Sequence, residues 1–537
     1  MKIYDVIIIG GGPTGVALGI ELGLNNVKTL ILEKHEAPLL SPRAQFINAR
    51  SMEFFSRWQI ASSLKAKQLL PYDFPLQQVW CSLLNGKTYA VSRPNEQLNN
   101  QLSPERMIQI PLWLTEETLR TRLQSLPTVT FLKNQAVEDV SLDSNRVQIT
   151  VKNNINQLET FHSRYLIACD GANSFTREKA GIAFDTLSPP QRVIHVMFAS
   201  QELKKLITVE KGVLYYVLES ARPGGIGIVD LARGLWHAQI RGNETADKIE
   251  DVNLHAILDE MVGFQFNKTI IQAHFWNMHI QLASHFSKEN RIFLVGDSAH
   301  AFAPIGAFGL NTGLGDVVNL GWKLAAVIRH EASPLLLETY EKERRPVCLH
   351  NLLIAHKNAD ELVTLRKKHD PSKDPDGFRD ALVNLASQIN HSLGATMGYA
   401  YFDSPLTLIQ KDQPNPTMNT ATYIPTLAPG YFLPHCWIEE QTSIYSALSP
   451  THWTLIICGK KEETLLEAAK KKFAAYGLPF KTLSIGEFYP ANYIVIRPDW
   501  HIVWTGFKLH LPYLEEHLFN NLFTIPRRQM SKIHENL

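Results

Sequence analysis

The sequence predicts an α/β protein in which a Rossmann-type dinucleotide-binding domain carries an inserted antiparallel sheet and is followed by a smaller α/β domain. Three observations predict this architecture: a glycine-rich turn after the first strand, alternating strand patterns in the middle of the chain, and a new strand–helix pattern after a proline-rich stretch. The 537 residues, 45% of them hydrophobic, are enough to fill two or three cores.

The N-terminal segment carries a pattern typical of dinucleotide binding. Gly10, Gly12 and Gly15 allow a tight turn and let a pyrophosphate approach the backbone at a helix N-terminus. Glu33 stands 18 residues after Gly15, where an acidic side chain accepts hydrogen bonds from an adenosine ribose and repels a 2′-phosphate. FAD or NAD is therefore favoured over NADP. The strand, helix and second strand of this unit are predicted over residues 4–9, 14–24 and 27–32.

The middle of the chain is predicted to form an antiparallel sheet. Pro75, Pro94 and Pro104 mark irregular segments, and residues 213–218 and 226–229 alternate as half-buried strands do. These segments lie between the glycine turn and a later nucleotide-reading motif. We therefore expect them to form a substrate domain inserted into the nucleotide-binding domain.

The later nucleotide-reading motif begins with an apolar strand at residues 291–295, which runs into Gly296 and Asp297 and then a helix. The Asp297 carboxylate is placed to accept a hydrogen bond from a ribityl hydroxyl, and the positive end of the helix would face a flavin. Small residues over 304–313 would let a planar ring lie against bare backbone, ahead of an amphipathic helix at 315–329. The two motifs together indicate a flavin rather than a nicotinamide.

The last third of the chain is predicted to contain a helix, an exposed loop and a separate domain. Residues 335–345 show a helical pattern that Pro346 closes, and residues 366–377 form a charged, proline-broken loop. Four prolines between residues 414 and 429 mark a linker. Beyond the linker, a strand, a helix and two strands are expected over residues 454–458, 462–476, 493–497 and 502–505.

The composition argues against several classes of protein. Lys and Arg number 53 against 52 for Asp and Glu, so the net charge of +1 offers no electrostatic reason to bind nucleic acid or an anionic membrane. The N-terminal apolar run ends at Gly10, far short of a signal peptide or of a membrane span of about 20 residues. A small-molecule partner and a cytoplasmic location are expected. The cysteines show no C-x-x-C pair and no metal-ligand spacing, so no metal is expected and all are predicted to be free thiols: Cys81, Cys169, Cys348, Cys436 and Cys458.

Three motifs carry a resemblance to a known family over essentially the whole chain. They are the N-terminal glycine pattern, the Cys-Asp-Gly-Ala-Asn-Ser sequence at residues 169–174, and the Gly-Asp-Ser-Ala-His sequence at residues 296–300. The chain resembles the class A flavoprotein monooxygenases, in the branch of phenol and polyketide hydroxylases that carry a C-terminal thioredoxin-like domain. Shorter matches support this at residues 42–44, 109, 309–313, 319–324, 340–346, 429–431, 433–435 and 495–499.

The resemblance implies a glutathione-reductase-like FAD-binding Rossmann domain, an inserted antiparallel-sheet substrate domain and a C-terminal thioredoxin-like α/β domain. Because the last domain lacks a C-x-x-C pair, packing or contacts in a homodimer are expected of it rather than disulfide exchange. The expected boundaries are 1–77, 106–185 and 286–355 for the FAD-binding domain, 78–105 and 186–285 for the substrate domain, 356–413 for a helical and loop connection, and 414–537 for the thioredoxin-like domain.

The resemblance also assigns cofactor contacts residue by residue. Glu33 would face the adenosine ribose, Arg43 and Gln109 the phosphates and the ribityl chain, and Asp297 the ribityl hydroxyls. Asp170 would contact the cofactor region and also serve nicotinamide binding. The other residues expected at the cofactor, from the glycine turn to the border of the isoalloxazine, are Gly10, Gly12, Pro13, Gly15, Lys34, Val137, Gly296, Pro304, Gly309, Leu310 and Asn311.

The activity that the resemblance implies is hydroxylation of a phenolic or polycyclic, polyketide-like aromatic substrate. FAD would be reduced by NADH or NADPH and would react with O₂ to a flavin hydroperoxide, which transfers its distal oxygen. The nicotinamide would bind transiently in a groove, since the sequence shows no second nucleotide-binding βαβ unit. Two alternatives stay open. The first is another flavin enzyme on the same fold, either an oxidoreductase without hydroxylation or an epoxidase or Baeyer–Villiger oxygenase. The second is a non-catalytic flavin-binding protein.

No catalytic base is assigned from the sequence. Two departures from the family pattern stand out: Gln45 takes the place of the active-site Asp of phenol hydroxylases, and Ala307 replaces the second of two glycines, which would shift the flavin ring or narrow the cavity beside it. Strand alternation would aim about half of the substrate candidates in the inserted sheet inward. These candidates are Tyr215, Tyr216, Arg222, Trp236, His237 and Gln239.

Overall fold

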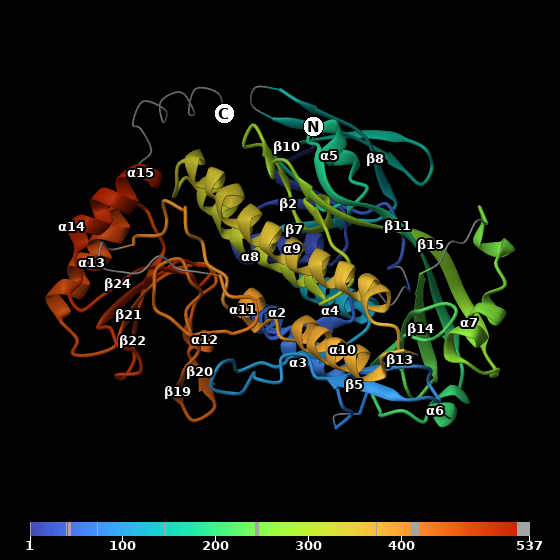
Figure 1. The fold of residues 1–537 in the computed structure, drawn as a ribbon. Coiled ribbons are helices and arrows are strands. Elements are labelled where there is room, and N and C mark those ends of the chain that lie inside the picture. The colour runs from blue at the N-terminus through green and yellow to red at the C-terminus, as the bar shows by residue number, and fades with distance from the viewer. Residues whose placement is uncertain are drawn as a thin grey trace.

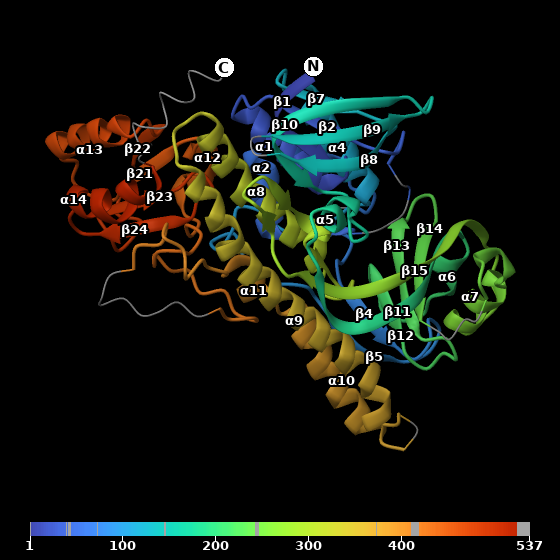
Figure 2. The ribbon, with the colours of Figure 1, turned by 90° about the horizontal axis from the view of Figure 1, so that it is seen from above.

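The computed structural model describes residues 2–38, 40, 44–71, 73–143, 146–241, 246–371, 373–409 and 418–523. Three sheet-containing parts lie side by side (Figures 1 and 2). The C-terminal part, drawn in red, lies on the opposite side of the molecule from the second sheet, drawn mainly in green. The long helix α9 (Glu338–Lys368) runs between them and across the N-terminal part.

A largely parallel sheet forms the centre of the N-terminal part. β1 (Lys2–Ile9) pairs in parallel with β2 (Thr29–Leu32) and β10 (Leu158–Ala168), and the sheet continues in parallel through β7 (Val129–Leu132) beyond β2 and β17 (Ile292–Leu294) beyond β10. β2 and the C-terminal halves of β1 and β10 are apolar and buried, as parallel strands covered on both faces are. The remaining strands of this sheet are β8 (Gln135–Leu142), β9 (Val147–Asn153) and β16 (Ser287–Lys288).

Helix α1 (Pro13–Leu24) leaves the first strand through the glycine turn. Pro13 occupies its first turn, where a proline costs no helical hydrogen bond and its fixed φ favours the helix. The helix packs against α4 (Leu112–Gln124) and α8 (Phe308–Ile328), so the first and last helices of the N-terminal part lie together. This arrangement brings the two nucleotide-reading motifs to one edge of the sheet.

The second sheet has eight strands in the order β18-β15-β11-β14-β13-β12-β4-β5. Neighbouring strands are antiparallel except for β12 and β4, which pair in parallel. Helix α7 (Leu254–Val262) packs with one face of the sheet in a separate apolar core. The strand bounds are β4 (Gln78–Cys81), β5 (Thr88–Ser92), β11 (Phe184–Ala199), β12 (Leu214–Val217), β13 (Gly224–Asp230), β14 (Leu235–Arg241), β15 (Thr269–Ala283) and β18 (His300–Ala301).

The C-terminal part is built on a four-stranded sheet. β21 (Trp453–Ile457), α13 (Glu463–Ala475) and β22 (Phe480–Ser484) form a parallel βαβ unit, and β23 (Tyr493–Ile496) and β24 (Ile502–Gly506) complete the sheet as antiparallel strands. The sequence pattern missed β22, because this edge strand is only partly buried and shows no clean apolar alternation. The thioredoxin-like assignment remains a prediction.

Two helices differ from the sequence expectation. α9 continues through Pro346, which was expected to end it, because buried residues such as Val347 and Cys348 on the next turn hold the helix against the core. α8 begins at Phe308 rather than near residue 315. The turn expected after the strand is confirmed as a single 3-10 turn at Gly296–Ser298, but β18 follows it directly instead of a helix. The helix that faces the late motif is therefore α8, reached through β18 and a loop.

The remaining elements are short or peripheral. They are β3 (Phe46–Ile47), α2 (Ala49–Arg57), α3 (Ala61–Ala66), β6 (Ile108–Gln109), α5 (Phe175–Lys179), α6 (Leu203–Leu206), α10 (Pro375–Asn390), α11 (Leu393–Met397), β19 (Trp437–Glu439), β20 (Thr442–Ser443), α12 (Ile444–Ala447), α14 (Leu511–Leu514) and α15 (Asn520–Leu522), with 3-10 turns at Ile249–Asp251 and Pro334–Leu337 and a π-turn at Glu515–Phe519.

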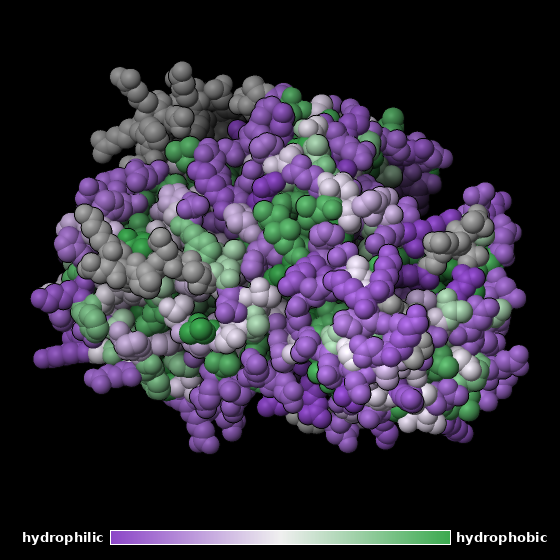
Figure 3. Space-filling model, in the orientation of Figure 1, coloured by the Kyte–Doolittle hydropathy of each residue, from purple (hydrophilic) through white to green (hydrophobic). Residues whose placement is uncertain are grey.

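The surface in Figure 3 is mainly polar, with apolar side chains in separate groups. Exposed large apolar residues include Leu353 and Val363 on α9 and Val383 on α10. Among the described residues, none of the helices combines the length and the apolar character needed to cross a bilayer.

Candidate functional site

The glycine turn between β1 and α1 forms an open backbone cradle. Gly10 has a φ of +105°, and a Cβ there would lie 2.2 Å from the carbonyl oxygen of Cys169. A Cβ at Gly15 would lie 2.0 Å from the carbonyl oxygen of Gly10, whereas a Cβ at Gly12 would meet nothing within 4 Å. The first turn of α1 has neither a side-chain cap nor an acidic residue, so its N–H groups can serve an anion.

Glu33 closes one side of this cradle. Its carboxylate accepts hydrogen bonds from the backbone N–H of Gly11 and of His35, each at 2.7 Å. Lys34 is exposed beside it, and β8, which carries the half-buried Val137, reaches the same corner through the Gln135 N–H to Glu33 carbonyl bond. This corner presents a fixed carboxylate at the edge of the parallel sheet.

The late Gly-Asp motif lies directly against the helix of the glycine turn. A Cβ at Gly296, whose φ is +65°, would lie 3.0 Å from Cγ2 of Thr14. Asp297 is exposed although both of its neighbours are buried, and its Oδ1 lies 4.0 Å from the position that a Cβ would take at Gly309. Two motifs far apart in the sequence therefore border one site.

The start of α8 is held in a strained conformation next to this site. Ala307 has a φ of +55°, in the left-handed region that favours glycine. Asn311 accepts a hydrogen bond from the N–H of Asn48 at 3.0 Å and donates to the carbonyl oxygens of Phe46 and Ala307 at 3.1 and 2.7 Å. These bonds fix α8 to the segment that follows β3. The other residues predicted here are Pro304, exposed in the preceding loop, and Gly309 and Leu310, half-buried in the first turn.

Gln109 links the N-terminal part to the second sheet. Its amide N–H₂ donates to Oε1 of Gln45 at 2.5 Å and to the carbonyl oxygen of Ile228 on β13 at 2.9 Å. Gln109 is only 1% exposed, and among the described residues its Oε1 finds no hydrogen-bond partner. Gln45, which replaces the expected Asp, is buried as part of this amide pair.

Two further residues are predicted to contact the cofactor, Asp170 and Arg43. Asp170 caps helix α5: it accepts hydrogen bonds from Oγ of Ser174 and from the N–H and the hydroxyl of Thr176 at 3.0 and 2.9 Å. Its contact with the cofactor region remains a prediction. Arg43 lies outside the described residues.

Strand register divides the substrate candidates between the two faces of the second sheet. Tyr216 stands opposite Gly225, and Gly225 stands opposite Gln239, so these residues share one face with His237. Trp80 extends this face, since its ring stacks on that of Tyr216 at 3.9 Å. Trp80 and Tyr216 also pack with the large core that the N-terminal part contributes to.

The other three candidates have structural contacts. Tyr215 and Trp236 belong to the core beneath α7, and the Trp236 indole donates to the carbonyl oxygen of Ser200 at 3.0 Å. Arg222 pairs with Glu260 at 3.3 Å, away from the strands. Of the six candidates, Tyr216, His237 and Gln239 are thus brought together on one face.

A comparison of the sequence with protein-family models identifies the family of this chain. The model of the FAD binding domain matches residues 3–352, which contain both nucleotide-reading motifs and the second sheet. The chain belongs to this FAD-binding family.

The chain is similar to several known proteins over almost its whole length. The chain is 25% identical to the FAD-dependent monooxygenase apdD of Emericella nidulans, covering 93% of this chain and 87% of that protein. It is also 25% identical to phenol 2-monooxygenase of a Pseudomonas species, covering 93% and 89%. The solved structure of RebC soaked with chromopyrrolic acid and containing 7-carboxy-K252c has a TM-score of 0.86 at 26% identity, covering 96% of this chain and 99% of RebC.

FAD fits the residues of this site. The open space over Gly12 admits a pyrophosphate close to the backbone. Asp297 offers a carboxylate to ribityl hydroxyls, and the Oε1 of Gln109, buried and lacking a partner among the described residues, offers an acceptor to a donor of the same cofactor. Glu33 offers the acceptor for the adenosine ribose.

Asp316 of α8 holds the floor of the FAD site together. Its carboxylate accepts hydrogen bonds from the Gly296 N–H at 3.1 Å, from Nε of Arg344 at 2.8 Å and from the imidazole of His300 at 2.7 Å. Burial disfavours the charge on His300, but Cys348 and Asp316 outweigh it and raise the pKa of His300 well above its usual value. Although His300, Asp316 and Cys348 could together ligate a metal, Arg344 already supplies the cation and the geometry favours a structural network.

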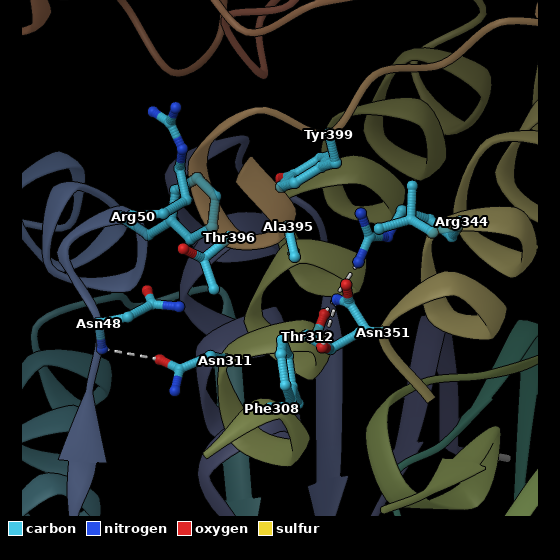
Figure 4. A pocket seen from close by; sticks show the side chains of 13 residues that line it. Asn48, Arg50, Phe308, Asn311, Thr312, Arg344, Asn351, Ala395, Thr396 and Tyr399 are labelled. Atoms are coloured by element: carbon cyan, nitrogen blue, oxygen red, sulfur yellow. Dashed lines mark hydrogen bonds between the residues drawn. The ribbon is translucent and has the colours of Figure 1, made fainter. Parts of the chain in front are cut away.

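A small cavity lies behind the start of α8, between α2, α9 and the α11 segment. Figure 4 shows the side chains of Arg344, Asn351 and Tyr399 around it, together with the Asn48–Asn311 bond. It leaves room for about one or two water molecules, and among the described residues the Asn351 Oδ1 and the Tyr399 hydroxyl have no protein partner. The cavity suits ordered water and is too small for an aromatic substrate.

The sequence analysis missed three residues on the substrate side. Trp80 lies on β4, which joins the sheet from a distant segment, and Gly225 and Arg241 share the face of Tyr216 and Gln239. For Arg241 a signal was available, because alternation along β14 places residue 241 on the same face as residues 237 and 239.

Proposed function

We propose that this chain is an FAD-dependent monooxygenase that uses NAD(P)H and O₂ to hydroxylate an aromatic substrate. The observation that carries the proposal is the meeting of the glycine turn and Asp297 at one FAD site, with the Trp80–Tyr216 face of the second sheet packed beside the same core. The net reaction converts an aromatic C–H, O₂, NAD(P)H and a proton into a phenol, water and NAD(P)⁺. The similarity to two monooxygenases over nearly the full length supports it.

The residues of the candidate FAD site would bind and orient the cofactor. The Gly12 backbone and the N-terminus of α1 would hold the pyrophosphate, Glu33 would hold the ribose, and Asp297 and Gln109 would hold the ribityl chain. When bound, FAD supplies the redox chemistry, since it accepts electrons from the reduced nicotinamide and passes them to O₂. The hydrogen bonds of Asn311 and Asp316 keep the start of α8 in place under this site.

The face of the second sheet binds the aromatic ring and keeps water out. Tyr216 and Trp80 offer a stacked aromatic surface, and Gln239 offers an amide. Burial lowers the pKa of His237 to about 4, so its imidazole is neutral at neutral pH. Its Nδ1 has no partner among the described residues and is available to accept a phenolic proton, a role that the Gln45 amide cannot fill.

NADH or NADPH is proposed to bind transiently. Among the described residues, the parallel sheet contains one glycine turn of the dinucleotide-binding kind, and in this proposal that turn would hold FAD. The co-substrate therefore needs a surface groove, and the choice between the two nicotinamides is part of the test.

The test uses the purified, FAD-loaded chain. Oxidation of NADH and NADPH is followed with a panel of phenols and polycyclic aromatics, under ¹⁸O₂, and the products are analysed by mass spectrometry. Acceleration by an aromatic compound that gains one ¹⁸O atom as a hydroxyl supports the proposal. Acceleration without label indicates a plain oxidoreductase, label in an epoxide or lactone indicates the other oxygenase chemistries, and no acceleration by any aromatic contradicts catalysis on this class. Asp297→Asn should lose activity in step with FAD, while the exposed Asp376→Asn serves as the matched control.

A further inference from the structure

The proposed substrate-side face of the second sheet leaves open space above Gly225, which we call the hollow. This glycine lies between Tyr216 on β12 and Gln239 on β14, and it presents bare backbone where the neighbouring strands carry long side chains. A Cβ built there would meet only the Cδ1 of Leu214, at 3.6 Å. A planar group can therefore lie against the strand, bounded on one side by the Trp80–Tyr216 stack.

Arg241 borders the same hollow. It lies two residues beyond Gln239 on β14, so alternation places it on the same face, and its strand partner on β11 is Val193. Val193 packs in the core shared with the N-terminal part, so the Arg241 end of β14 is the end near that part. Arg241 and Tyr216 lie close enough that each affects the other's pKa, since Arg241 lowers the pKa of the Tyr216 phenol and Tyr216 raises that of Arg241.

The charge of Arg241 is not balanced by the protein residues that the structure describes. Within them, no carboxylate forms an ion pair with this guanidinium, and Arg241 itself is half-buried. Burial lowers the pKa of Arg241, and the opposing influence comes from Tyr216 alone. A desolvated guanidinium without an anion is costly, and an anion supplied by a ligand removes that cost.

We propose that Arg241 binds a carboxylate of the aromatic substrate, whose ring lies over Gly225 against the Tyr216 and Trp80 stack. This rests on the proposed function, because it places the ligand on the substrate side of the FAD site. One guanidinium matches one negative charge and the planar, two-oxygen geometry of a carboxylate. A doubly charged phosphate would leave a second charge without a partner. The substrate class is thus an aromatic carboxylic acid.

The experiment measures binding and needs no turnover. Two pairs of probes differ only in charge: 3-(3-hydroxyphenyl)propionate with its amide, and 6-hydroxy-2-naphthoate with its amide. Each is titrated into the FAD-loaded full chain, and Kd is read from the perturbation of the flavin absorbance. The wild type is expected to bind at least one acid about 10- to 100-fold more tightly than its amide, as a charge-assisted bidentate contact allows.

Three variants test whether Arg241 causes the preference for the acid over its amide. Arg241→Gln should abolish the preference for the acid while leaving the Kd of the amide unchanged, and Arg241→Lys should keep part of it. Arg222→Gln, which changes an arginine paired with Glu260 outside the hollow, should keep all of it. Equal Kd values for acid and amide in the wild type, binding of neither acid, or a preference that survives in Arg241→Gln overturns the proposal.

The outcome is separable from that of the proposed function. A preference for the acid that depends on Arg241, without incorporation of ¹⁸O, would leave the carboxylate subsite standing and remove the hydroxylase assignment. Hydroxylation of neutral phenols by a chain that shows no preference for acids would support the hydroxylase assignment and remove the carboxylate subsite.

Discussion

Arg497 of the C-terminal part forms a buried ion pair with Glu343 of helix α9, with 2.6 Å between Nη1 and Oε1. Lys323 of α8 shares the same carboxylate at 2.6 Å, and Asp499 pairs with Arg497 from within the C-terminal part. Charged contacts thus attach the C-terminal part to α9 and, through Lys323, to α8, whose first turn lies next to Asp297.

Removing the Arg497 charge should destabilise the whole molecule. Arg497→Met leaves Glu343 and Asp499 buried with less compensation, and breaking a buried pair in this way costs about 3–5 kcal/mol. The measurement is the free energy of unfolding of the FAD-loaded chain in urea. Arg379→Met on the exposed face of α10 is the matched control, and equal losses in the two variants would contradict the role given to Arg497.

Acid should weaken the fold through Glu343. Burial alone would raise the pKa of this carboxyl, but Arg497 and Lys323 lower it to about 2, against an ordinary value of 4.5. A depressed carboxyl pKa stabilises the fold fully above pH 4.5, and this contribution of roughly 3 kcal/mol is lost as the pH falls from 4.5 to 2. The unfolding free energy of Glu343→Gln should be lower at pH 7 and depend less on pH over that interval. An unchanged slope would refute the assignment.

Replacing Ala307 by glycine should stabilise the protein. The left-handed φ of +55° strains an alanine by roughly 1–2 kcal/mol, and the greater freedom of glycine in the unfolded chain offsets part of that. A net gain of about 0.5–1 kcal/mol is expected in urea unfolding. Ala474→Gly, the same change on the exposed face of α13, should instead lose up to about 1 kcal/mol. The same sign for both variants would argue against strain at residue 307.

The two glycines of the cradle should respond differently to alanine. Gly12→Ala places a methyl group in open space, so the FAD-free chain should keep its thermal stability while the Kd for FAD rises about tenfold or more. Gly15→Ala places its Cβ 2.0 Å from the Gly10 carbonyl oxygen and should destabilise the FAD-free chain as well. Thermal melting and flavin fluorescence titration separate the effects, and unchanged FAD affinity in Gly12→Ala would rule out this cradle as the pyrophosphate site.

His237 is expected to contribute to catalysis by accepting the phenolic proton on its Nδ1. With a phenolic substrate, His237→Gln is expected to lower kcat about 100-fold near pH 7 and to recover as the pH approaches the phenol's own pKa near 10. The pH–rate profile checks this, with the exposed His285→Gln as control. A loss that is the same at every pH would show that His237 only packs.

The local structure of the candidate FAD site could be predicted from the sequence because each of its parts depends on nearby residues, whereas its contacts with FAD stay a prediction. Gly10, Gly12 and Gly15 are set by a turn, Glu33 by the end of a strand, and Asp297 by a short motif. The pairing of Gln45 with Gln109 could not be predicted, since it depends on how two distant segments approach.

Longer-range features escaped prediction for the same reason. Pro346 was read as a helix end because proline removes one hydrogen bond, yet packing on the following turn outweighs that loss. Arg497 and Glu343 lie 154 residues apart and neither has a sequence signal of pairing. Arg241 was overlooked because its significance depends on the bare Gly225 strand and on the absence of a paired carboxylate among the described residues around it.

The parallel pairing of β4 with β12 has a consequence for synthesis of the chain. The hairpin of β4 and β5 leaves the ribosome long before β12, because residues 93–213 must be translated between them. At about 5–20 residues per second, this hairpin waits roughly 6–24 s with an unpaired apolar edge that contains Val79, Trp80 and Cys81. During that interval the nascent chain offers a template for mispairing, so we expect expression of this protein to depend on chaperones and on slow growth at low temperature.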